Sequence, residues 1–420
     1  MIEDRDLFER AVQRFAPPEG SFDRLIALRD RKRRNQRIAA GVVGIAIALG
    51  VAFIGARLLR SESTPADWTP APSSVRNGEF VMVRGTFWSP DTDPELIAVD
   101  PDSGAVRHLA TCDQECGVLP GAWSPSGTDL LFSTGGRLRT LDMETGSSRS
   151  LVPGRAVGAT FSPDGERILY DAGMPPTTPT DVVLARSDGG GGRSLGPLAG
   201  MNLPWSQWSP DGQSIAYFDH GVHFSDGAIG ILRLGRQPVS RTFVSFPRAD
   251  PCNTPSAPLG CVHSVTMSPV DGRIAYATFD PAAGTDTVRV IDPDSGEISV
   301  IGTWRPTARP DQLPSRMAWS PDGSRIAYVE DCRFWLIAPD GTNRTLIGDL
   351  GACMAVPDQL AWSPDGTELA FYELGRDAEG VLQEVTLTVL PLDEGQVRRL
   401  ATFEPDDSVG LQPLVWRPIP

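Results

Sequence analysis

The chain has 420 residues and a formal net charge of −15 at pH 7. This acidic balance argues against a general nucleic-acid-binding protein, because neutralising phosphates requires a basic surface. Its 43 glycines and 38 prolines make up about a fifth of the residues, and so many helix breakers exclude an all-helical fold. The length suits two or three ordinary domains or one large repeat architecture.

An uncharged stretch near the N-terminus predicts a membrane anchor. Residues 38–56 carry no charged side chain, and at about 1.5 Å per residue they span roughly a hydrocarbon core. Six basic residues lie within 29–37 and only Arg57 and Arg60 follow closely, so the N-terminus is expected in the cytoplasm. We therefore expect a single-pass protein of the cell membrane, with one transmembrane helix over 38–59. A cleaved signal peptide is the alternative, although no Ala-x-Ala site closes the apolar run.

Two further segments flank this anchor. Residues 1–37 place apolar side chains at near-helical spacing, which predicts a short amphipathic helical segment. Such a segment either docks on a cytoplasmic protein partner or is an unpartnered tail whose basic end sets the topology. Residues 60–77 are rich in Ser, Thr and Pro, which is typical of a semi-extended linker.

A short phrase, usually aromatic-Ser-Pro-Asp-Gly, recurs along the rest of the chain at intervals of 38 to 59 residues. Its six serines are Ser124, Ser162, Ser209, Ser268, Ser320 and Ser363. Short apolar runs and a second turn, such as Asp292–Gly296, follow each phrase. This period is that of a four-stranded propeller blade. Pro and Asp-Gly supply the turn, and the aromatic residue is expected to pack between neighbouring blades.

The two ends of the repeat region complement each other. Residues 77–84 match the second half of the phrase, whereas Leu414–Pro418 match its missing first half. A C-terminal strand over 413–418 should therefore complete the first blade and remove the open sheet edge. The sequence thus predicts an all-β, seven-bladed propeller over 78–420, with blades that start near 78, 121, 159, 206, 265, 317 and 360.

The six phrases resemble the WD40-like (PD40) repeats of TolB-type propellers. The N-terminal sequence DLFERAVQRFAPPEGSFDRLIALRDRKRR is similar to that of membrane-tethered propellers of actinobacteria. This resemblance implies a propeller that acts as a protein-interaction module in the periplasm or at the cell surface. Related propellers are attached to serine peptidases, and no peptidase domain is recognised in this chain. The fold alone therefore does not carry a function.

The cysteines are even in number and all follow the predicted anchor, which favours disulfides on the oxidising side of the membrane. In the blade arrangement Cys112 and Cys116 share one connection between blades, and so do Cys252 and Cys261. Cys332 is expected to face the same side as Cys353. Metal binding by the Cys-x3-Cys spacing is the alternative for the first pair.

No catalytic constellation is visible, and the chain contains no His-Glu-x-x-His. His220 and His223 form only a loose zinc pattern beside Asp219, and exposed loop histidines explain it equally. Asp100–Gly104 and Asp292–Gly296 begin like calcium loops, yet Asp and Gly are also what tight turns require. We therefore predict no catalytic residue, metal or cofactor.

Two functions remain. The first is a scaffold or sensory module that binds an unidentified protein or cell-envelope ligand. Its long loops should gather on one face, with Phe243, Phe246 and Trp304 as anchors. The alternative is that these aromatics only seal blade junctions. The opposite face should be acidic, with side chains that include Asp164, Asp211, Asp322 and Asp365. The second function is a propeller lyase or hydrolase that acts on an extracellular polymer at the channel mouth.

Overall fold

The chain divides into two compact units, Met1–Glu62 and Ser63–Pro420. The computed structural model describes residues of the second unit only: 75–85, 94–113, 116–173, 181–195, 206–219, 227–246, 261–280, 283–305, 317–330, 333–350, 355–376, 381–393, 396–404 and 414–420. Every regular element in these ranges is a β-strand, and none of them contains a helix able to cross a membrane. The predicted cytoplasmic segment 1–37 and transmembrane helix 38–59 lie outside the described residues.

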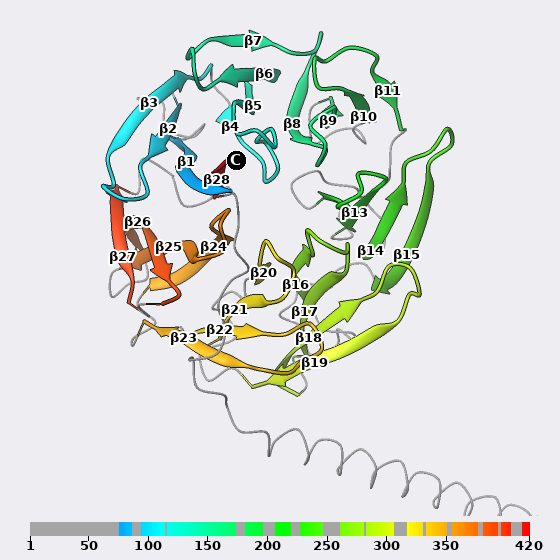
Figure 1. The fold of residues 1–420 in the computed structure, drawn as a ribbon, viewed down its shortest axis with the longest axis vertical. Helices are drawn as coiled ribbons and strands as arrows, with labels where there is room; N and C mark the ends of the chain where they lie inside the picture. Colours follow the sequence, from blue (N-terminus) through cyan, green and yellow to red (C-terminus); the bar gives the residue numbers. More distant parts are fainter. Residues whose placement is uncertain are drawn as a thin grey trace, which may run out of the picture. The chain divides into compact units, whose positions relative to one another are not determined.

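The strands form seven four-stranded antiparallel sheets round a common axis, as the blades of a propeller (Figure 1). From the axis outward, blade 1 consists of β28 (Val415–Ile419), β1 (Arg76–Arg84), β2 (Glu95–Val99) and β3 (Val106–Thr111). Blade 2 consists of β4 (Cys116–Gly117), β5 (Asp129–Thr134), β6 (Arg137–Asp142) and β7 (Ser148–Ser150). Blade 3 consists of β8 (Ala156–Phe161), β9 (Arg167–Ala172), β10 (Asp181–Arg186) and β11 (Arg193–Ser194).

The remaining blades follow the same order. Blade 4 consists of β12 (Gln207–Trp208), β13 (Ser214–Asp219), β14 (Gly227–Arg233) and β15 (Val239–Phe246). Blade 5 consists of β16 (Cys261–Met267), β17 (Ile274–Asp280), β18 (Thr285–Ile291) and β19 (Ile298–Trp304). Blade 6 consists of β20 (Met317–Trp319), β21 (Ile326–Glu330), β22 (Arg333–Ile337) and β23 (Thr345–Asp349). Blade 7 consists of β24 (Ala355–Trp362), β25 (Glu368–Arg376), β26 (Leu382–Pro391) and β27 (Arg398–Phe403). The predicted all-β, seven-bladed propeller is confirmed.

The C-terminal strand closes the propeller as the sequence predicted. β28 pairs with β1 in the register Phe80↔Trp416 and Val81↔Val415. The rings of Phe80 and Trp416 lie 4.2 Å apart between centroids. Blade 1 is therefore built from both ends of the repeat region, and β28 covers the inner edge of β1.

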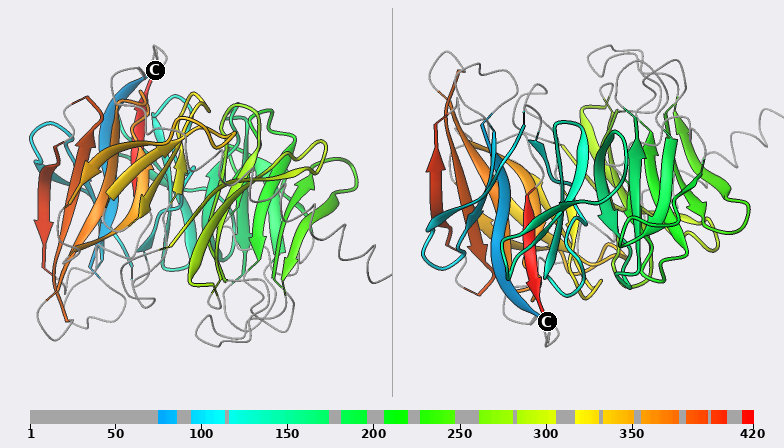
Figure 2. Two further views of the ribbon diagram at one scale, coloured as in Figure 1. Left: turned by 90° about the horizontal axis from the view of Figure 1, so that it is seen from below. Right: turned by 90° about the horizontal axis from the view of Figure 1, so that it is seen from above.

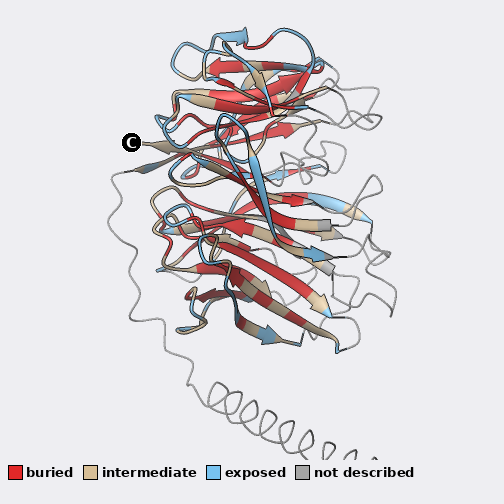
Figure 3. Cartoon of the chain, turned by 90° about the vertical axis from the view of Figure 1, so that its right-hand side faces the viewer, coloured by how far each residue is buried: buried red, intermediate tan, exposed pale blue. Residues whose placement is uncertain are grey.

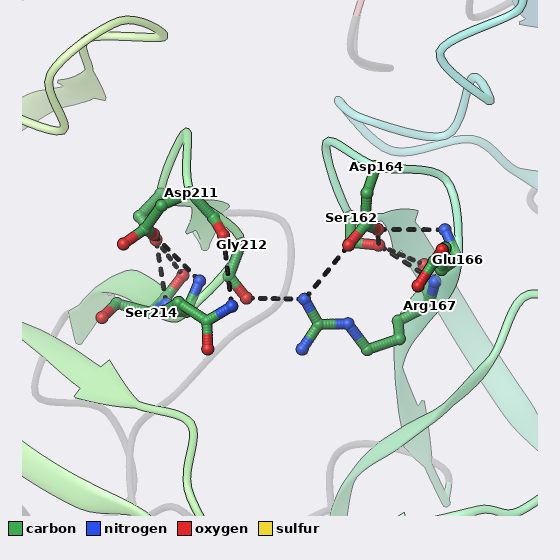
Figure 4. Close-up of polar contacts among 9 residues, drawn as sticks. Ser162, Asp164, Glu166, Arg167, Asp211, Gly212 and Ser214 are labelled. Carbon is green, nitrogen blue, oxygen red and sulfur yellow. Dashed lines mark hydrogen bonds and ion pairs between the residues drawn. The ribbon is translucent and has the colours of Figure 1, made fainter.

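The repeated phrase forms the turn between the first and second strands of a blade (Figure 4). In blade 3 the amide of Gly165 donates to the carbonyl of Ser162 at 2.8 Å. The Ser162 hydroxyl donates to the Asp164 carboxylate, and it accepts from the amide of Arg167 at 3.0 Å. The Asp164 carboxylate also accepts from the amide of Glu166 at 3.0 Å. Each polar residue of the phrase thus bonds within its own turn, as Asx-type turns do.

The apolar core lies between neighbouring blades, where the inner strands are buried (Figure 3). One cluster joins Phe334 and Leu336 of blade 6 to Leu369 and Phe371 of blade 7. The rings of Phe334 and Phe371 lie 4.6 Å apart between centroids, in a tilted arrangement. A blade therefore buries its apolar side chains against the next blade in the propeller, which makes closure a condition of stability.

Five outermost strands share a β-bulge. In each of them one residue has no partner in the register with the third strand. These residues are Leu109, Phe243, Ile301, Ile347 and Leu400, and all of them belong to or pack against the apolar clusters. A bulge re-aims a side chain, and here the extra residue in each case is a large apolar one.

Two of these bulged residues lie so close to a turn in the next blade that the turn requires a glycine. A Cβ on Gly104 would lie 2.1 Å from the carbonyl oxygen of Leu400, and one on Gly341 would lie 2.6 Å from that of Ile301. Both glycines also have positive φ, 70° and 79°. Glycine is required at these turns by its backbone conformation and by the close approach of the preceding blade.

Candidate functional site

The propeller has two faces of different construction. The turn face carries the aromatic-Ser-Pro-Asp-Gly turns and the turns that join the third and fourth strands. The C-terminus marks this face in Figure 2, because β28 ends there and β1 begins there. The loop face is the opposite face, where second strands connect to third strands and each blade connects to the next.

Asp164, Asp211 and Asp365 of the repeated phrase have lowered pKa values on the turn face, because their own turns stabilise the charged form. The hydroxyl of Ser162 and the amide of Glu166 hold the pKa of Asp164 below its usual value. Ser209 and the amide of Gln213 do the same for the pKa of Asp211. At Asp365, burial works in the opposite direction, but the hydrogen bonds from Ser363 and Thr367 outweigh it and the pKa is lowered. The three carboxylates therefore accept hydrogen bonds from their own turns.

A second set of carboxylates lies in the turns between third and fourth strands. Asp100 accepts from the hydroxyl and amide of Ser103, and Asp292 accepts from the amides of Asp294 and Ser295. These hydrogen bonds lower the pKa of both aspartates. In the two segments that begin like calcium loops, this first aspartate therefore bonds to its own turn.

Arginines that the sequence reasoning did not single out join neighbouring blades on the turn face. The guanidinium of Arg167 in blade 3 donates to the carbonyl of Gly212 in blade 4 at 2.9 Å (Figure 4). The same guanidinium lies 5.3 Å from the ring centroid of Trp208. Arg417 of blade 1 makes the same pair of contacts with Gly127 and Trp123 of blade 2, at 2.7 and 5.6 Å. For Arg167, a recurring arginine shortly after Asp-Gly was the available signal. Arg417 directly follows Trp416, in the serine position of the phrase, and had no such signal.

Two of the three predicted anchor aromatics pack in separate blade junctions. Phe243 is the bulged residue of β15; it is half-buried, and the Arg241 guanidinium lies 4.9 Å from its ring centroid. Trp304 ends β19 and stacks on Tyr328 of blade 6, with ring centroids 4.7 Å apart. The buried indole N–H of Trp304 has no hydrogen-bond partner among the described residues. Phe246 ends β15, and its side chain lies outside the described part of the chain.

The structure forms one of the three predicted disulfides. Cys112 and Cys116 are bonded, with their Cα atoms 5.6 Å apart, across the connection from β3 to β4. Cys252, Cys332 and Cys353 lie outside the described residues, as does the side chain of Cys261. The pairings 252–261 and 332–353 therefore stay predictions.

Of the four histidines, only His108 has a side chain within the described part of the chain. His108 lies on β3, where its Nε2 is 3.6 Å from the carboxylate of Glu95, which also binds Arg84. His220 and His223 lie outside the described residues, as does the side chain of His263. Within the ranges that the structure describes, no three side chains of the metal-binding types are grouped so that they could hold an ion.

Comparison with known proteins shows the fold. No protein-family model matches the chain, and no curated protein matches it. A solved structure described as oligogalacturonate lyase in complex with manganese is 14% identical over 79% of this chain and 86% of its own, with a TM-score of 0.51. Identity this low shows a shared propeller fold alone.

Solved TolB structures are matched as well. TolB from Acinetobacter baumannii is 17% identical, with a TM-score of 0.41, over 64% of this chain and 62% of its own. The match therefore spans less than two thirds of that TolB chain. A TolB structure from Agrobacterium tumefaciens is 16% identical over 82% of this chain and 99% of its own, with a TM-score of 0.39. The seven-bladed propeller that the repeats predict is confirmed by the seven four-stranded sheets of the structure.

Proposed function

We propose that this protein is a membrane-tethered, extracytoplasmic propeller that binds a protein or cell-envelope ligand through its loop face. The observation that carries the proposal is the unequal use of the two faces. On the turn face, the aspartates and arginines of the repeat are engaged in turns and in contacts between blades. The loop face carries the longest connections between blades, such as 247–260 and 305–316, and connections of this kind carry function on rigid scaffolds.

The tether follows from the N-terminal sequence. The uncharged residues 38–56 and the basic residues 29–37 support an uncleaved anchor with a cytoplasmic N-terminus. The propeller then lies outside the membrane, where the disulfide of Cys112 and Cys116 is chemically stable. Residues 1–37 are proposed to meet a cytoplasmic protein partner.

The proposed anchors are Phe246 and Trp304, which end β15 and β19 on the loop face next to the two long connections. Phe243 is the third, with its half-buried ring in the junction between blades 4 and 5. Aromatic residues of this kind dominate interface energetics when they enter a pocket of the partner. Phe243 and Trp304 also pack inside the propeller, so loss of either ring would change stability together with binding.

The test is affinity capture of cell-envelope components by the full chain in detergent, with the Phe246→Ala variant beside it. Val239→Ala is the matched control, because Val239 begins the same strand on the turn face and is 61% exposed. Phe246→Ala should lose the captured component and keep the melting temperature, whereas Val239→Ala should keep both. Equal capture by Phe246→Ala, or a melting temperature lowered without loss of capture, contradicts the proposal.

A lyase is the second candidate, favoured by the shared fold with the manganese-bound oligogalacturonate lyase. Incubation with oligogalacturonate and Mn²⁺ tests it directly, because β-elimination leaves an unsaturated product that absorbs ultraviolet light. Steady formation of that product by the full chain would replace the binding proposal with the enzymatic one. Absence of product beside a productive capture experiment would exclude this substrate.

A further inference from the structure

Three tryptophans of the repeated phrase join their blade to the preceding one. In blade 4 the indole N–H of Trp208 donates to the hydroxyl of Thr160 in blade 3, at 3.0 Å. In blades 6 and 7 the indoles of Trp319 and Trp362 donate to backbone carbonyls of the preceding blade, at 3.2 and 2.9 Å. Each acceptor belongs to the residue that directly precedes the aromatic position of the phrase in the earlier blade: Thr160, Thr266 and Ala318.

Trp123, the corresponding tryptophan of blade 2, lacks this bond. It is 7% exposed, and its buried indole N–H has no hydrogen-bond partner among the described residues. The preceding blade is here blade 1, in which Val415 of β28 precedes the aromatic position at Trp416. Val415 is buried in the same apolar cluster as Trp123. Its side chain offers no acceptor, whereas Thr160 in the same position of blade 3 offers a hydroxyl.

The two phrases without an aromatic indole in this position use their backbone instead. The amide of Phe161 in blade 3 donates to the carbonyl of Gly121 in blade 2 at 2.8 Å. The amide of Met267 in blade 5 donates to the side-chain carbonyl of Gln207 in blade 4 at 2.6 Å. Neither phrase contains an indole that could be left unpaired, so the junction between blades 1 and 2 differs from both.

The junction between blades 3 and 4 is the closest match for comparison. An arginine crosses both junctions: Arg417 donates to the carbonyl of Gly127, as Arg167 does to that of Gly212. The junction of blades 3 and 4 adds the indole bond of Trp208. A buried N–H without an acceptor has lost its hydration without compensation. Separation of blade 1 from blade 2 would return the unpaired indole to water, whereas separation of blade 3 from blade 4 would break an existing bond.

Blade 1 is bonded to blade 7 on its other side. The amide of Asp365 in blade 7 donates to the side-chain carbonyl of Asn77 at 3.2 Å. The guanidinium of Arg398, also in blade 7, donates to the backbone carbonyl of Pro101 at 3.2 Å. A local opening beside β28 therefore separates blade 1 from blade 2 and leaves it attached to blade 7.

We propose that the propeller opens locally between blades 1 and 2, along β28, more readily than at its other junctions. Local openings occur where the fewest interactions are lost, and this opening hydrates an indole N–H that the closed propeller leaves unpaired. Arg417 holds the junction closed, because its guanidinium bonds to Gly127 and lies over the ring of Trp123. This device belongs to the propeller itself and goes beyond the proposed function, since it needs neither a ligand nor the anchor.

The first experiment is hydrogen exchange of the full chain in detergent, read by mass spectrometry of peptic fragments. Fragments that contain β28 should exchange faster than fragments that contain β8, the innermost strand of blade 3. Val415→Thr places a hydroxyl where blade 3 has that of Thr160, so it should give the indole of Trp123 an acceptor and slow the exchange of β28 by about fivefold. Equal exchange of β28 and β8 in the unmodified chain overturns the proposal, as does exchange of β28 that Val415→Thr does not slow.

The Trp123→Phe background is the control for this gain. Without the indole the new hydroxyl has no donor to accept from, so Val415→Thr should not slow the exchange of β28 there. Simple fraying of a terminal strand would be indifferent to residue 123. Equal slowing in both backgrounds therefore overturns the role of the unpaired indole.

A second comparison decides the matter even if Val415→Thr fails to fold. Trp123→Phe and Trp319→Phe remove the same ring atoms from similarly buried positions, 7% and 5% exposed. Trp319→Phe also removes an existing hydrogen bond to blade 5, whereas Trp123→Phe removes a buried donor that has none. The urea concentration at the midpoint of unfolding should therefore fall less for Trp123→Phe. An equal or larger fall for Trp123→Phe overturns the proposal.

Discussion

The indole N–H of Trp416 donates a hydrogen bond to the carbonyl oxygen of Gly78, 2.8 Å away and 338 residues earlier in the chain. Trp416 is 7% exposed and packs on Phe80, which is fully buried. The contact therefore joins both ends of the repeat region inside one blade. Because each blade buries its core against its neighbours, this closure stabilises the whole propeller.

Deletion of residues 413–420 should destabilise the propeller by several kcal/mol, since it removes β28 and exposes the inner edge of β1. Trp416→Ala should cost about 3 to 5 kcal/mol, the usual loss for a large buried aromatic. Trp416→Phe is the matched control: it keeps a ring against Phe80 and loses the hydrogen bond to Gly78, at about 1 kcal/mol. Urea denaturation of the full chain in detergent measures all three. A truncated chain that unfolds at the same urea concentration as the intact one would show that closure is not required.

Arg167→Ala should lower the free energy of unfolding by about 1 to 2 kcal/mol, because it removes the hydrogen bond to Gly212 and the contact with the Trp208 ring. Arg186→Ala is the control, since Arg186 is exposed and pairs with Asp188 within its own turn, and we expect less than about 0.5 kcal/mol there. Denaturant unfolding compares the variants. Equal effects would mean that Arg167 contributes nothing across the blade junction.

Asp164→Asn should make stability less sensitive to acid. The Ser162 hydroxyl and the Glu166 amide hold the pKa of Asp164 below its ordinary value in the folded chain. The ionised carboxylate therefore contributes stability above the pKa of the unfolded chain, and this contribution is lost as pH falls through the folded pKa. The variant should therefore be less stable at neutral pH, and the difference should shrink below about pH 4. Asp102→Asn, an exposed change on the same face, is the control. A deficit that persists unchanged at low pH would refute the linkage.

With the proposed anchor, protease added to intact spheroplasts should degrade the propeller and leave a small membrane-bound N-terminal fragment, because the basic run within 29–37 is proposed to keep the N-terminus in the cytoplasm. An antibody against residues 1–37 detects the fragment. Lysed spheroplasts are the control, in which the fragment should shrink further. A propeller that stays protected in intact cells, or a mature chain without residues 1–37, contradicts the proposed anchor.

The sequence by itself determined the number of blades and their closure. The spacing of the serines and the complementary ends at 77–84 and 414–418 predict both, because turn chemistry and strand alternation are local properties. The Cys112–Cys116 disulfide is predicted for the same reason, since both residues lie in one short connection.

Only the tertiary structure decided what lies across each blade junction. In the sequence, Phe243 and Trp304 are both aromatic residues near a long predicted loop. In the structure, Phe243 is the bulged residue of β15 between blades 4 and 5, whereas Trp304 stacks on Tyr328 of blade 6. The contact of Arg167 with Gly212 joins residues 45 positions apart, and no local pattern encodes that distance. Packing between blades depends on which surfaces the closed propeller brings together, and this is a property of the whole chain.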